Sequence, residues 1–231
     1  MVTAPGTAAV VRSALDEAFA AAASHSTSIA VLDAGCGRVS ALKAYRPRIA
    51  RFVGADIHAP VPGSLPHLDE FREVDLCGPA DAFAPGSFDV ILSSFTLEHF
   101  SDPVAAVGNM RGWLRPGGRL VITTVNRRNP LVRAYLDLPD GVRRRVQPLV
   151  KATAADAHPL VGACNDPAAV EAALRQAGFE MIEITTTAHL ATAWGRRRLP
   201  RLLGRLGDAL TAHYPSRRST IVAHAIAPTG A

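Results

Sequence analysis

Two glycines stand directly after an apolar run near the start of the chain, in residues 29–39, which read IAVLDAGCGRV. Gly35 and Gly37 carry no Cβ, so a bound molecule can approach their backbone closely. Asp33 precedes the glycines, and Asp56 ends the next apolar run, 21 residues after Gly35. A carboxylate at the end of a second strand can accept hydrogen bonds from two ribose hydroxyls. These residues predict a nucleoside-binding site.

The charge beside the glycines separates two kinds of nucleoside ligand. Asp33 would repel the pyrophosphate of a dinucleotide, but it suits a ligand that carries an ammonium and a sulfonium. Ser40 occupies the place of the last glycine in the dinucleotide fingerprint, and no tyrosine of the chain has a lysine four positions on. The pattern therefore disfavours NAD.

Seven apolar runs rich in β-branched residues recur along the chain with helical stretches between them. They span residues 28–33, 50–56, 71–75, 88–93, 119–125, 180–185 and 220–226. This alternation predicts an α/β fold, with a largely parallel sheet covered by helices on both faces. Ligands of such sheets bind outside the carboxyl ends of the strands, which is where the glycines and Asp56 fall.

Two helices have clear start and stop signals. Asp102 can cap a helix whose first turn holds Pro103, and the sequence Pro-Gly-Gly at 116–118 is expected to end it. The predicted buried face of this helix holds Val104, Val107 and Leu114. The second helix is predicted over residues 167–176, and Gly178 is typical of a C-terminal stop.

Composition indicates one domain in a reducing compartment. The chain has 231 residues, of which 48% are hydrophobic, and no run of about 18 apolar residues that would predict a membrane span. Its three cysteines are scattered, without a CxxC pair, which argues against a disulfide framework and a zinc site. We therefore expect a cytoplasmic protein without a metal centre.

The single domain is predicted to have four parts. Residues 1–27 form an N-terminal helix, 28–126 the ligand-binding core, 127–165 a helical insertion, and 166–231 the last part of the sheet with a basic helical segment over 196–213. Roughly 40 residues of the insertion carry no strand signal, which is too long for an ordinary loop.

Five stretches resemble, in order and spacing, the motifs of a known family. They read VLDAGCG at 31–37, GADI at 54–57, VDL at 74–76, FDVILSSFTLEHFSDP at 88–103 and LRPGGRLVITT at 114–124, and the likeness resumes with DPAAVEAALRQAGFE at 166–180. The sequence is similar to class I S-adenosylmethionine-dependent methyltransferases, in the branch with quinone-biosynthesis-type and other small-molecule enzymes. The resemblance implies a Rossmann-like fold with a mostly parallel seven-stranded sheet and a helical insertion after strand five.

The resemblance also implies which residues hold the methyl donor, S-adenosylmethionine. Asp33 with the backbone of Gly35 and Gly37 would hold the methionine part, Asp56 the ribose hydroxyls, Ile57 the adenine face, Asp75 and Leu76 the adenine amino edge, and Ser93 and Ser94 would line the path of the methyl group. Each aspartate could instead be only a strand-end or turn residue. Val39 stands where the family often has a third glycine; a β-branched residue resists positive φ there, and we expect donor binding to survive this change.

His99 lies between the fourth strand and its helix, beside the expected methyl donor. A histidine with an ordinary pKa of about 6.5 could accept a proton from an acceptor hydroxyl or amine. In the alternative interpretation, His99 and Glu98 only shape the pocket or satisfy a helix end. Both interpretations stay open from the sequence.

Two late segments carry the positive charge. Residues 127–151 have a net charge of +5 and residues 196–218 a net charge of +6, within a total of +5 for the chain. Leu202, Leu203, Leu206 and Leu210 fall at helical spacing among arginines, in a helix weakened by Gly204 and Gly207. One interpretation is a lid whose apolar side packs over the site with the arginines in solvent. The other is contact with an anionic membrane or a lipid-like acceptor.

Three functions remain to be compared. The resemblance implies methyl transfer to a small-molecule or lipid-like acceptor. The basic charge also allows a nucleic-acid (RNA) methyltransferase, but the chain lacks the Asn/Asp-Pro-Pro-aromatic and Pro-Cys motifs of nucleic-acid enzymes, and aromatic residues are sparse in its basic segments. A non-catalytic regulator that only binds the cofactor is the third possibility.

Overall fold

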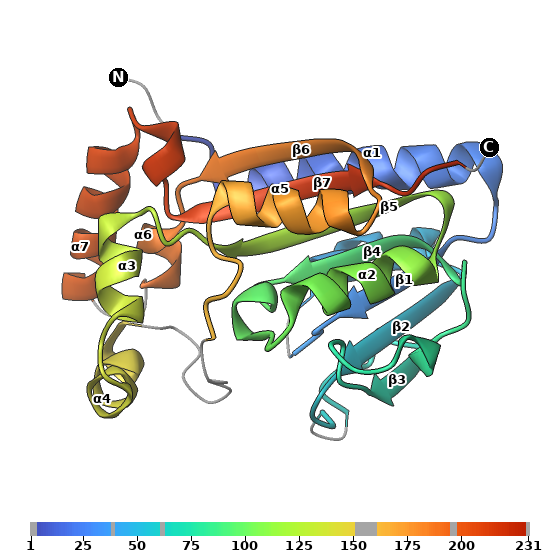
Figure 1. Cartoon of the computed structure of the whole chain (residues 1–231), viewed down its shortest axis with the longest axis horizontal. Helices are drawn as coiled ribbons and strands as arrows, with labels where there is room; N and C mark the ends of the chain where they lie inside the picture. Colours follow the sequence, from blue (N-terminus) through green and yellow to red (C-terminus); the bar gives the residue numbers. More distant parts are fainter. Residues whose placement is uncertain (1–3, 38–39, 61–62, 151–160, 195–197, 230–231) are drawn as a thin grey trace.

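The computed structural model describes residues 4–37, 40–60, 63–150, 161–194 and 198–229 (Figure 1). Within them, seven strands form one sheet in the order β3-β2-β1-β4-β5-β7-β6. The strands are β1 (Ala30–Ala34), β2 (Arg51–Asp56), β3 (Glu70–Glu73), β4 (Phe88–Ser94), β5 (Leu114–Val125), β6 (Glu180–Thr187) and β7 (Thr220–Ile226). β7 runs antiparallel to both of its neighbours, whereas the other pairs are parallel. The predicted mostly parallel, Rossmann-like sheet is confirmed.

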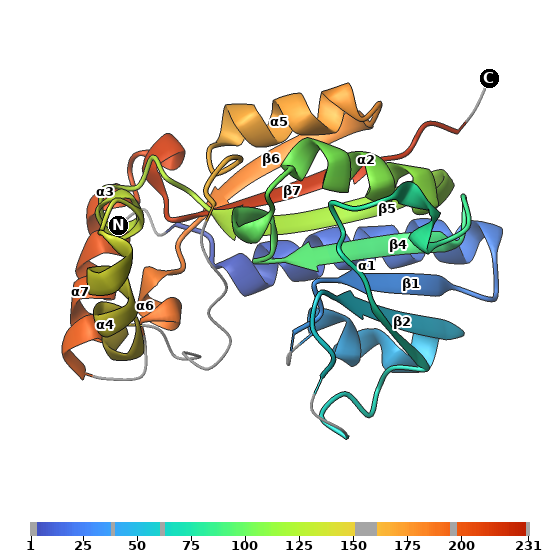
Figure 2. The same ribbon diagram turned by 60° about the horizontal axis from the view of Figure 1, so that its bottom comes forward.

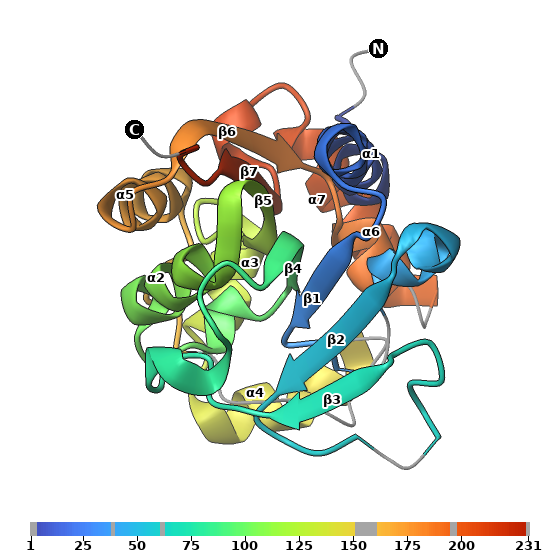
Figure 3. The ribbon, with the colours of Figure 1, turned by 90° about the vertical axis from the view of Figure 1, so that its right-hand side faces the viewer.

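Helices cover both faces of this sheet, as predicted (Figure 3). The α-helices are α1 (Thr7–His25), α2 (Pro103–Trp113), α3 (Pro130–Leu136), α4 (Asp140–Val150), α5 (Pro167–Gln176), α6 (Leu190–Ala193) and α7 (Arg198–Thr211). Short 3-10 helices are η1 (Ala41–Arg48), η2 (Ala80–Ala82), η3 (Leu97–His99) and η4 (Pro215–Arg217). α2 and α5 lie side by side on one face, and α1 with η1 lies on the other.

Alternate strand residues feed two apolar cores, because successive side chains of a strand point to opposite faces. Leu32 belongs to the core under α2 and α5, together with Phe88 and Trp113. Its neighbour Val31 belongs to the core under α1 and η1. In that second core the rings of Phe19 and Tyr45 stack with centroids 4.6 Å apart. The sheet therefore holds both helical layers and fixes its strand ends in space.

The predicted start of α2 is confirmed, but the helix ends earlier than predicted, and of the three predicted face residues Val107 and Leu114 are buried whereas Val104 is not. The side chain of Asp102 accepts a hydrogen bond from the backbone N of Ala105 at 3.0 Å. The helix ends at Trp113, and Leu114 already belongs to β5. Val104 is 37% exposed, whereas Val107 is buried.

The Pro-Gly-Gly sequence at 116–118 does not end the helix but lies inside β5. The pairing of β4 with β5 shifts in register there, since Phe88 faces Leu114 and Val90 faces Arg119. Gly117 has a φ of 74° and donates its N–H to Ala227 at 3.0 Å. A bulge of this kind suits glycine, and it explains why a typical stop signal occurs within a strand.

The helix predicted over 167–176 is confirmed as α5. Asp166 caps it by accepting hydrogen bonds from the N–H groups of Ala168 and Ala169 at 3.0 and 3.2 Å. Gly178 has a φ of 81°, the left-handed conformation expected after a helix end.

Four helices, α3, α4, α6 and α7, gather beyond the carboxyl ends of the parallel strands (Figures 1 and 2). α3 and α4 occupy the predicted insertion, of which residues 151–160 lie outside the described residues. Asn126 and Asn129 join the start of the insertion to the segment before β7 by donating side-chain N–H groups to backbone oxygens of Arg218 and Arg217, at 2.7 and 2.9 Å. The insertion and the C-terminal segment therefore form one helical group at this end.

α7 confirms the predicted basic helix but not the lid interpretation in which its apolar side is packed. Leu202, Leu203, Leu206 and Leu210 are 62, 47, 55 and 66% exposed. The packed side consists instead of Gly204, Gly207 and Thr211, all buried. A Cβ on Gly204 would lie 2.7 Å from the carbonyl carbon of Leu190, so the glycines allow α7 to approach α6 closely. Among the described residues, none of the helices is both long and apolar enough to cross a membrane.

Candidate functional site

The loop after β1 is built around Gly35. Gly35 and Cys36 donate their N–H groups to the carbonyl oxygen of Ala55 in β2, at 2.7 and 3.1 Å. Gly35 has a φ of 78°, and a Cβ there would lie 2.3 Å from the side chain of Thr96. Gly37, with a φ of 47°, has open space where a Cβ would stand. The backbone of the loop is therefore held against β2 and the loop after β4, and leaves room beside Gly37.

Asp33 is a buried carboxylate with an unsatisfied oxygen. Its residue is 1% exposed, and Oδ2 has no hydrogen-bond partner among the described residues. Burial raises the pKa of Asp33 to about 7, a hydrogen bond with Ser40 acts in the opposite direction, and the nearby Asp56 raises the pKa further. A buried carboxylate oxygen that has no hydrogen-bond partner is costly for the fold. An ammonium or sulfonium ligand would supply the missing partner.

Asp56 brings the end of β2 to the glycine loop. Its Oδ2 accepts a hydrogen bond from the N–H of Gly37 at 3.1 Å, and its Oδ1 accepts one from the N–H of His58 at 3.3 Å. The neighbouring Ile57 is 49% exposed. The structure therefore brings together Asp33, the two glycines, Asp56 and an apolar side chain, as the sequence predicted. Val39 lies outside the described residues.

Asp75 and Leu76 lie beyond the end of β3 and serve local structure. The exposed Asp75 carboxylate accepts the N–H of Cys77 at 2.9 Å, which is the turn-forming role considered as its alternative. The side chain of Leu76 is buried in the core, and its carbonyl oxygen accepts a hydrogen bond from Asn109 at 3.0 Å. Leu76 could therefore contact a ligand only through its backbone. The predicted contact of Asp75 and Leu76 with the adenine amino edge stays a prediction.

The end of β4 holds the two predicted serines and a strained phenylalanine. Ser93 is fully buried, and its Oγ has no partner among the described residues. Ser94 Oγ lies 3.1 Å from Thr123 Oγ1. Phe95 follows with a φ of 54°, held by hydrogen bonds from its N–H to the carbonyl and hydroxyl oxygens of Thr123 at 2.9 and 3.1 Å. Strained backbone of this kind concentrates at functional sites.

A buried polar network that the sequence did not reveal underlies the loop after β4. Thr124 donates its hydroxyl to Glu98 at 2.9 Å, and Asn165 lies 3.5 Å from the same hydroxyl. The carbonyl oxygen of Glu98 accepts hydrogen bonds from the N–H groups of Val161 and Gly162 at 3.0 and 3.2 Å. Glu98 therefore ties the loop to the end of the insertion, which fits the structural role considered for it.

His99 ends η3 and donates its backbone N–H to Thr96 at 2.9 Å. Through Thr96, His99 is connected to the loop that carries Gly35. His99 is partly buried. This placement is compatible with its predicted role beside the methyl donor and does not separate that role from a structural one.

Phe95 and His189 form a contact that sequence reasoning missed. Their rings stack with centroids 5.0 Å apart and an interplanar angle of 24°. Burial lowers the pKa of His189, and Asp208 acts in the opposite direction. His189 thereby places the start of α6 against the end of β4. No sequence signal indicates this contact, because the two residues are distant in the chain and a positive φ at phenylalanine is not visible in a sequence.

Two kinds of chemistry find no support at the site. Burial, together with the nearby charges of Asp33 and Asp56, raises the pKa of Cys36 to about 12, so its thiol is a poor nucleophile. In the part of the chain that the structure describes, no three His, Cys, Asp or Glu residues are grouped so that they could hold a metal ion.

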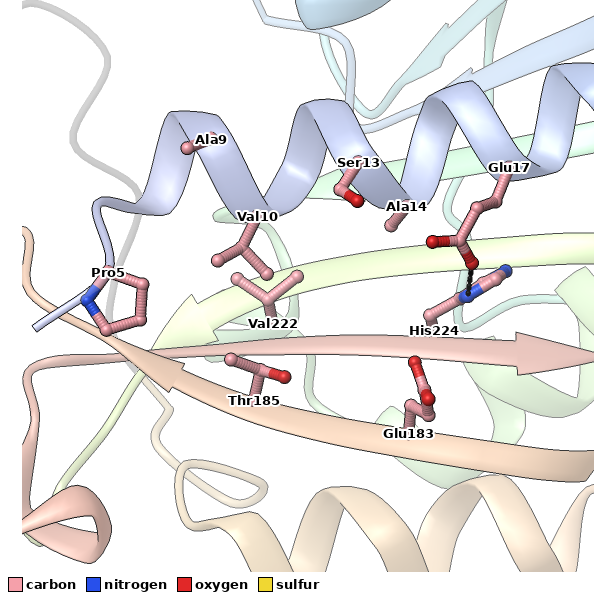
Figure 4. A pocket seen from close by; sticks show the side chains of 10 residues that line it. All are labelled: Pro5, Ala9, Val10, Ser13, Ala14, Glu17, Glu183, Thr185, Val222 and His224. Atoms are coloured by element: carbon pink, nitrogen blue, oxygen red, sulfur yellow. Dashed lines mark ion pairs between the residues drawn. The ribbon is translucent and has the colours of Figure 1, made fainter.

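A separate cavity of about 430 Å³ lies between α1, β6 and β7 (Figure 4). His224 and Glu17 face each other across it, with His224 Nδ1 and Glu17 Oε2 4.0 Å apart. Burial and the nearby Arg119 lower the pKa of His224, which weakens this ion pair. The cavity contains none of the residues predicted from the sequence.

Comparisons with known proteins agree with the fold. A sequence model described as "Methyltransferase domain" matches residues 8–184. The chain is 32% identical over 130 residues to a ubiquinone biosynthesis O-methyltransferase of Pseudomonas paraeruginosa, which covers 53% of this chain and 54% of the relative. The chain thus spans about half the length of the curated relatives it matches.

Solved structures show the same fold at low identity. An S-adenosylmethionine-dependent methyltransferase of Mesorhizobium loti superimposes with a TM-score of 0.55 at 17% identity, covering 96% of this chain and 98% of the other. A phosphoethanolamine N-methyltransferase 2 of Haemonchus contortus, in complex with S-adenosyl-L-methionine, gives a TM-score of 0.54 at 15% identity, covering 92% of this chain and 52% of the other. At these identities the likeness concerns the fold alone.

Proposed function

The chain belongs to the methyltransferase domain family, and we propose that it transfers the methyl group of S-adenosylmethionine to a small-molecule acceptor. The observation that carries the proposal is Asp33, a buried carboxylate whose Oδ2 has no partner among the described residues and which directly precedes the glycine loop. This arrangement fits a ligand with a positively charged methionine part better than it fits a pyrophosphate.

Asp33 and the glycine loop would hold the methionine part of the donor. The ammonium group would pair with Asp33, and the open space beside Gly37 would admit the ligand against the backbone. Asp56 would accept the ribose hydroxyls while keeping Gly37 in place, and the exposed side chain of Ile57 would cover the adenine. Asp75 and the backbone of Leu76 would meet the adenine amino edge.

The donor would supply an electrophilic methyl carbon on a sulfonium: the acceptor would bond to this carbon in line, the S–CH3 bond would break, and S-adenosylhomocysteine would leave. The protein's task is mainly to align donor and acceptor. Ser93 and Ser94 would line the methyl path at the end of β4, and the Phe95 turn, which is hydrogen-bonded to Thr123, would fix their position. His99 would accept the acceptor's proton when the acceptor is a hydroxyl or an amine.

We propose that the acceptor is lipid-like and that the methylated atom is an oxygen. The first support is the 32% identity to ubiquinone biosynthesis O-methyltransferases over about half of the chain. The second is the helical group of α3, α4, α6 and α7, which lies beyond the strand ends where the acceptor must enter. Exposed apolar side chains gather on α7, and they suit an apolar acceptor better than a nucleic acid.

The direct test is formation of S-adenosylhomocysteine by the full chain with quinol-type and lipid-like phenol acceptors. We expect acceptor-dependent product. Asp33→Asn should raise the KM for the donor at least about tenfold, because the ammonium loses a buried charged partner. Asp81→Asn, at an exposed carboxylate of η2, is the matched control and should leave the KM unchanged.

The same assay tests His99. His99→Ala should lower kcat and leave the donor KM unchanged, because His99 acts on the acceptor. Donor binding without product from any acceptor would contradict methyl transfer and favour a non-catalytic regulator. Product formed only with RNA would contradict the small-molecule acceptor.

A further inference from the structure

The outward face of α7 is made of leucines. Five of them lie on this helix and are between 47 and 66% exposed: Leu199, Leu202, Leu203, Leu206 and Leu210. At about 100° per residue, they fall within one arc of about 100° on the helix surface. In a globular protein such a stripe normally faces the core, and exposed apolar patches mark interaction sites.

The packing of the opposite side keeps these leucines outside. A Cβ on Gly207 would lie 2.5 Å from the side chain of Leu131 in α3, so this side of α7 already touches its neighbour. Asp208 accepts hydrogen bonds from the N–H groups of Leu190 and Ala191 at 3.2 and 2.9 Å. Turning the leucines inward would break these contacts.

Arginines border the leucine face. Arg198, Arg201 and Arg205 are exposed and fall on an adjoining arc of about 60° on the same helix. A helix with leucines on one side and arginines beside them matches the surface of an anionic bilayer, since the leucines can enter the apolar boundary while the guanidinium groups meet phosphates.

We propose that α7 binds the surface of an anionic lipid bilayer through its leucine face. α7 lies on the outer side of the helical group beyond the strand ends (Figure 2), so the bilayer would meet the molecule at the end that carries the proposed site. A second copy of the chain is a less suitable partner. A two-fold contact between leucine faces would bring the bordering arginines of the two copies together, and like charges repel.

The test is co-sedimentation of the full chain with vesicles of phosphatidylcholine alone and of phosphatidylcholine with roughly one third phosphatidylglycerol. We expect binding to the anionic vesicles. The double variant Leu202→Gln, Leu206→Gln should bind at least about tenfold more weakly, because it removes two apolar side chains from the boundary. Met181→Gln is the matched control, since Met181 is 78% exposed but lies on β6. It should bind like the wild type.

A second variant separates charge from apolar contact. Arg201→Gln, Arg205→Gln should lose most of the preference for anionic over neutral vesicles, and added salt should do the same to the wild type. Folding of every variant is checked by circular dichroism and thermal unfolding.

Three results would overturn the proposal. They are absence of binding by the wild type, equal loss of binding in the Met181 control, and a dimer in lipid-free sedimentation velocity that the leucine variant abolishes. The last result would make the face a contact between copies. The measurement uses neither methyl donor nor acceptor, so its failure would leave the proposed methyl transfer standing.

Discussion

At the scale of residues, the position, burial and pKa of Asp33 all bear on the proposed binding of a cationic donor. Its position two residues before Gly35 predicts a ligand with positive charge, and the structure adds that the carboxylate is buried with one oxygen lacking a partner among the described residues. The pKa of Asp33 is raised to about 7 in the folded chain, so ionising this carboxyl costs more free energy in the folded state than in the unfolded state. The stability of the ligand-free protein should therefore fall as the pH rises from about 4 to about 7. A bound cation would offset that cost.

Binding of S-adenosylmethionine should therefore depend on pH. The cationic donor favours ionised Asp33, whose pKa is about 7, so binding below that pH must release a proton. We expect the affinity to rise by up to about tenfold per pH unit between about pH 6 and 7, and to stop rising at about pH 8, where the amino group of the donor begins to lose its own proton. Calorimetry in buffers of different ionisation enthalpy measures both the affinity and the released proton.

Asp33→Asn should remove this pH dependence together with most of the affinity, whereas Asp81→Asn should leave both unchanged. An affinity that stays constant across the range, with no proton released, would contradict the proposed pairing of Asp33 with the donor.

Only some residues of the site could be predicted from the sequence. Asp33, Gly35 and Asp56 could be predicted, because strand ends in an open sheet meet at one edge and the chain order gives the strand ends. Phe95 and His189 could not, because their contact depends on a strained turn and on the placement of α6. The role predicted for Leu76 at the adenine stays a prediction, and because its side chain belongs to the core, only its backbone can serve that role.

At the scale of elements, periodicity predicted the helices better than it predicted their packed sides. α7 has the expected leucine spacing, yet its glycines pack and its leucines face solvent. The predicted burial of the α7 leucines is wrong because a second arrangement competes with it. An apolar stripe is usually buried, but in α7 the glycines allow a close backbone contact on another side of the helix. Similarly, the Pro-Gly-Gly sequence at 116–118, which was predicted to end α2, lies inside β5.

Gly204→Ala should destabilise the protein. The added Cβ would lie 2.7 Å from the backbone of Leu190, so α7 must move away from α6. We expect the free energy of unfolding to fall by about 1 to 3 kcal/mol, as for overpacked contacts, even though alanine is the better helix former. Urea unfolding followed by circular dichroism measures the change.

Gly108→Ala is the matched control within α2. Apart from its own helix backbone, no heavy atom of the described residues lies within 4 Å of a Cβ built at this position, so the helix preference of alanine should act alone. We expect the free energy of unfolding to rise by up to about 1 kcal/mol. Equal effects of the two substitutions would contradict the close packing of α7 on α6.

At the scale of the whole molecule, the sheet separates two tasks. The carboxyl ends of β1, β2 and β4 carry the residues proposed for the donor, and the helical group lies beyond them, where we propose that the acceptor enters. Six of the seven strands could be predicted as apolar runs, whereas β3 (Glu70–Glu73) is short and mostly polar and could be predicted from its place after β2. The orientation of the helical group could not, since it depends on side-chain contacts of Asn126, Asn129 and Asp208 that join distant segments.

The central claim is that the site binds S-adenosylmethionine and uses it as methyl donor. The most direct measurement is a calorimetric titration of the full chain with S-adenosylmethionine and, in parallel, with NADH, repeated with Asp56→Ala. The account predicts binding of S-adenosylmethionine alone and at least about tenfold weaker binding in the variant, because Asp56 both accepts the ribose hydroxyls and holds Gly37. Binding of NADH instead, or of neither ligand, would contradict it.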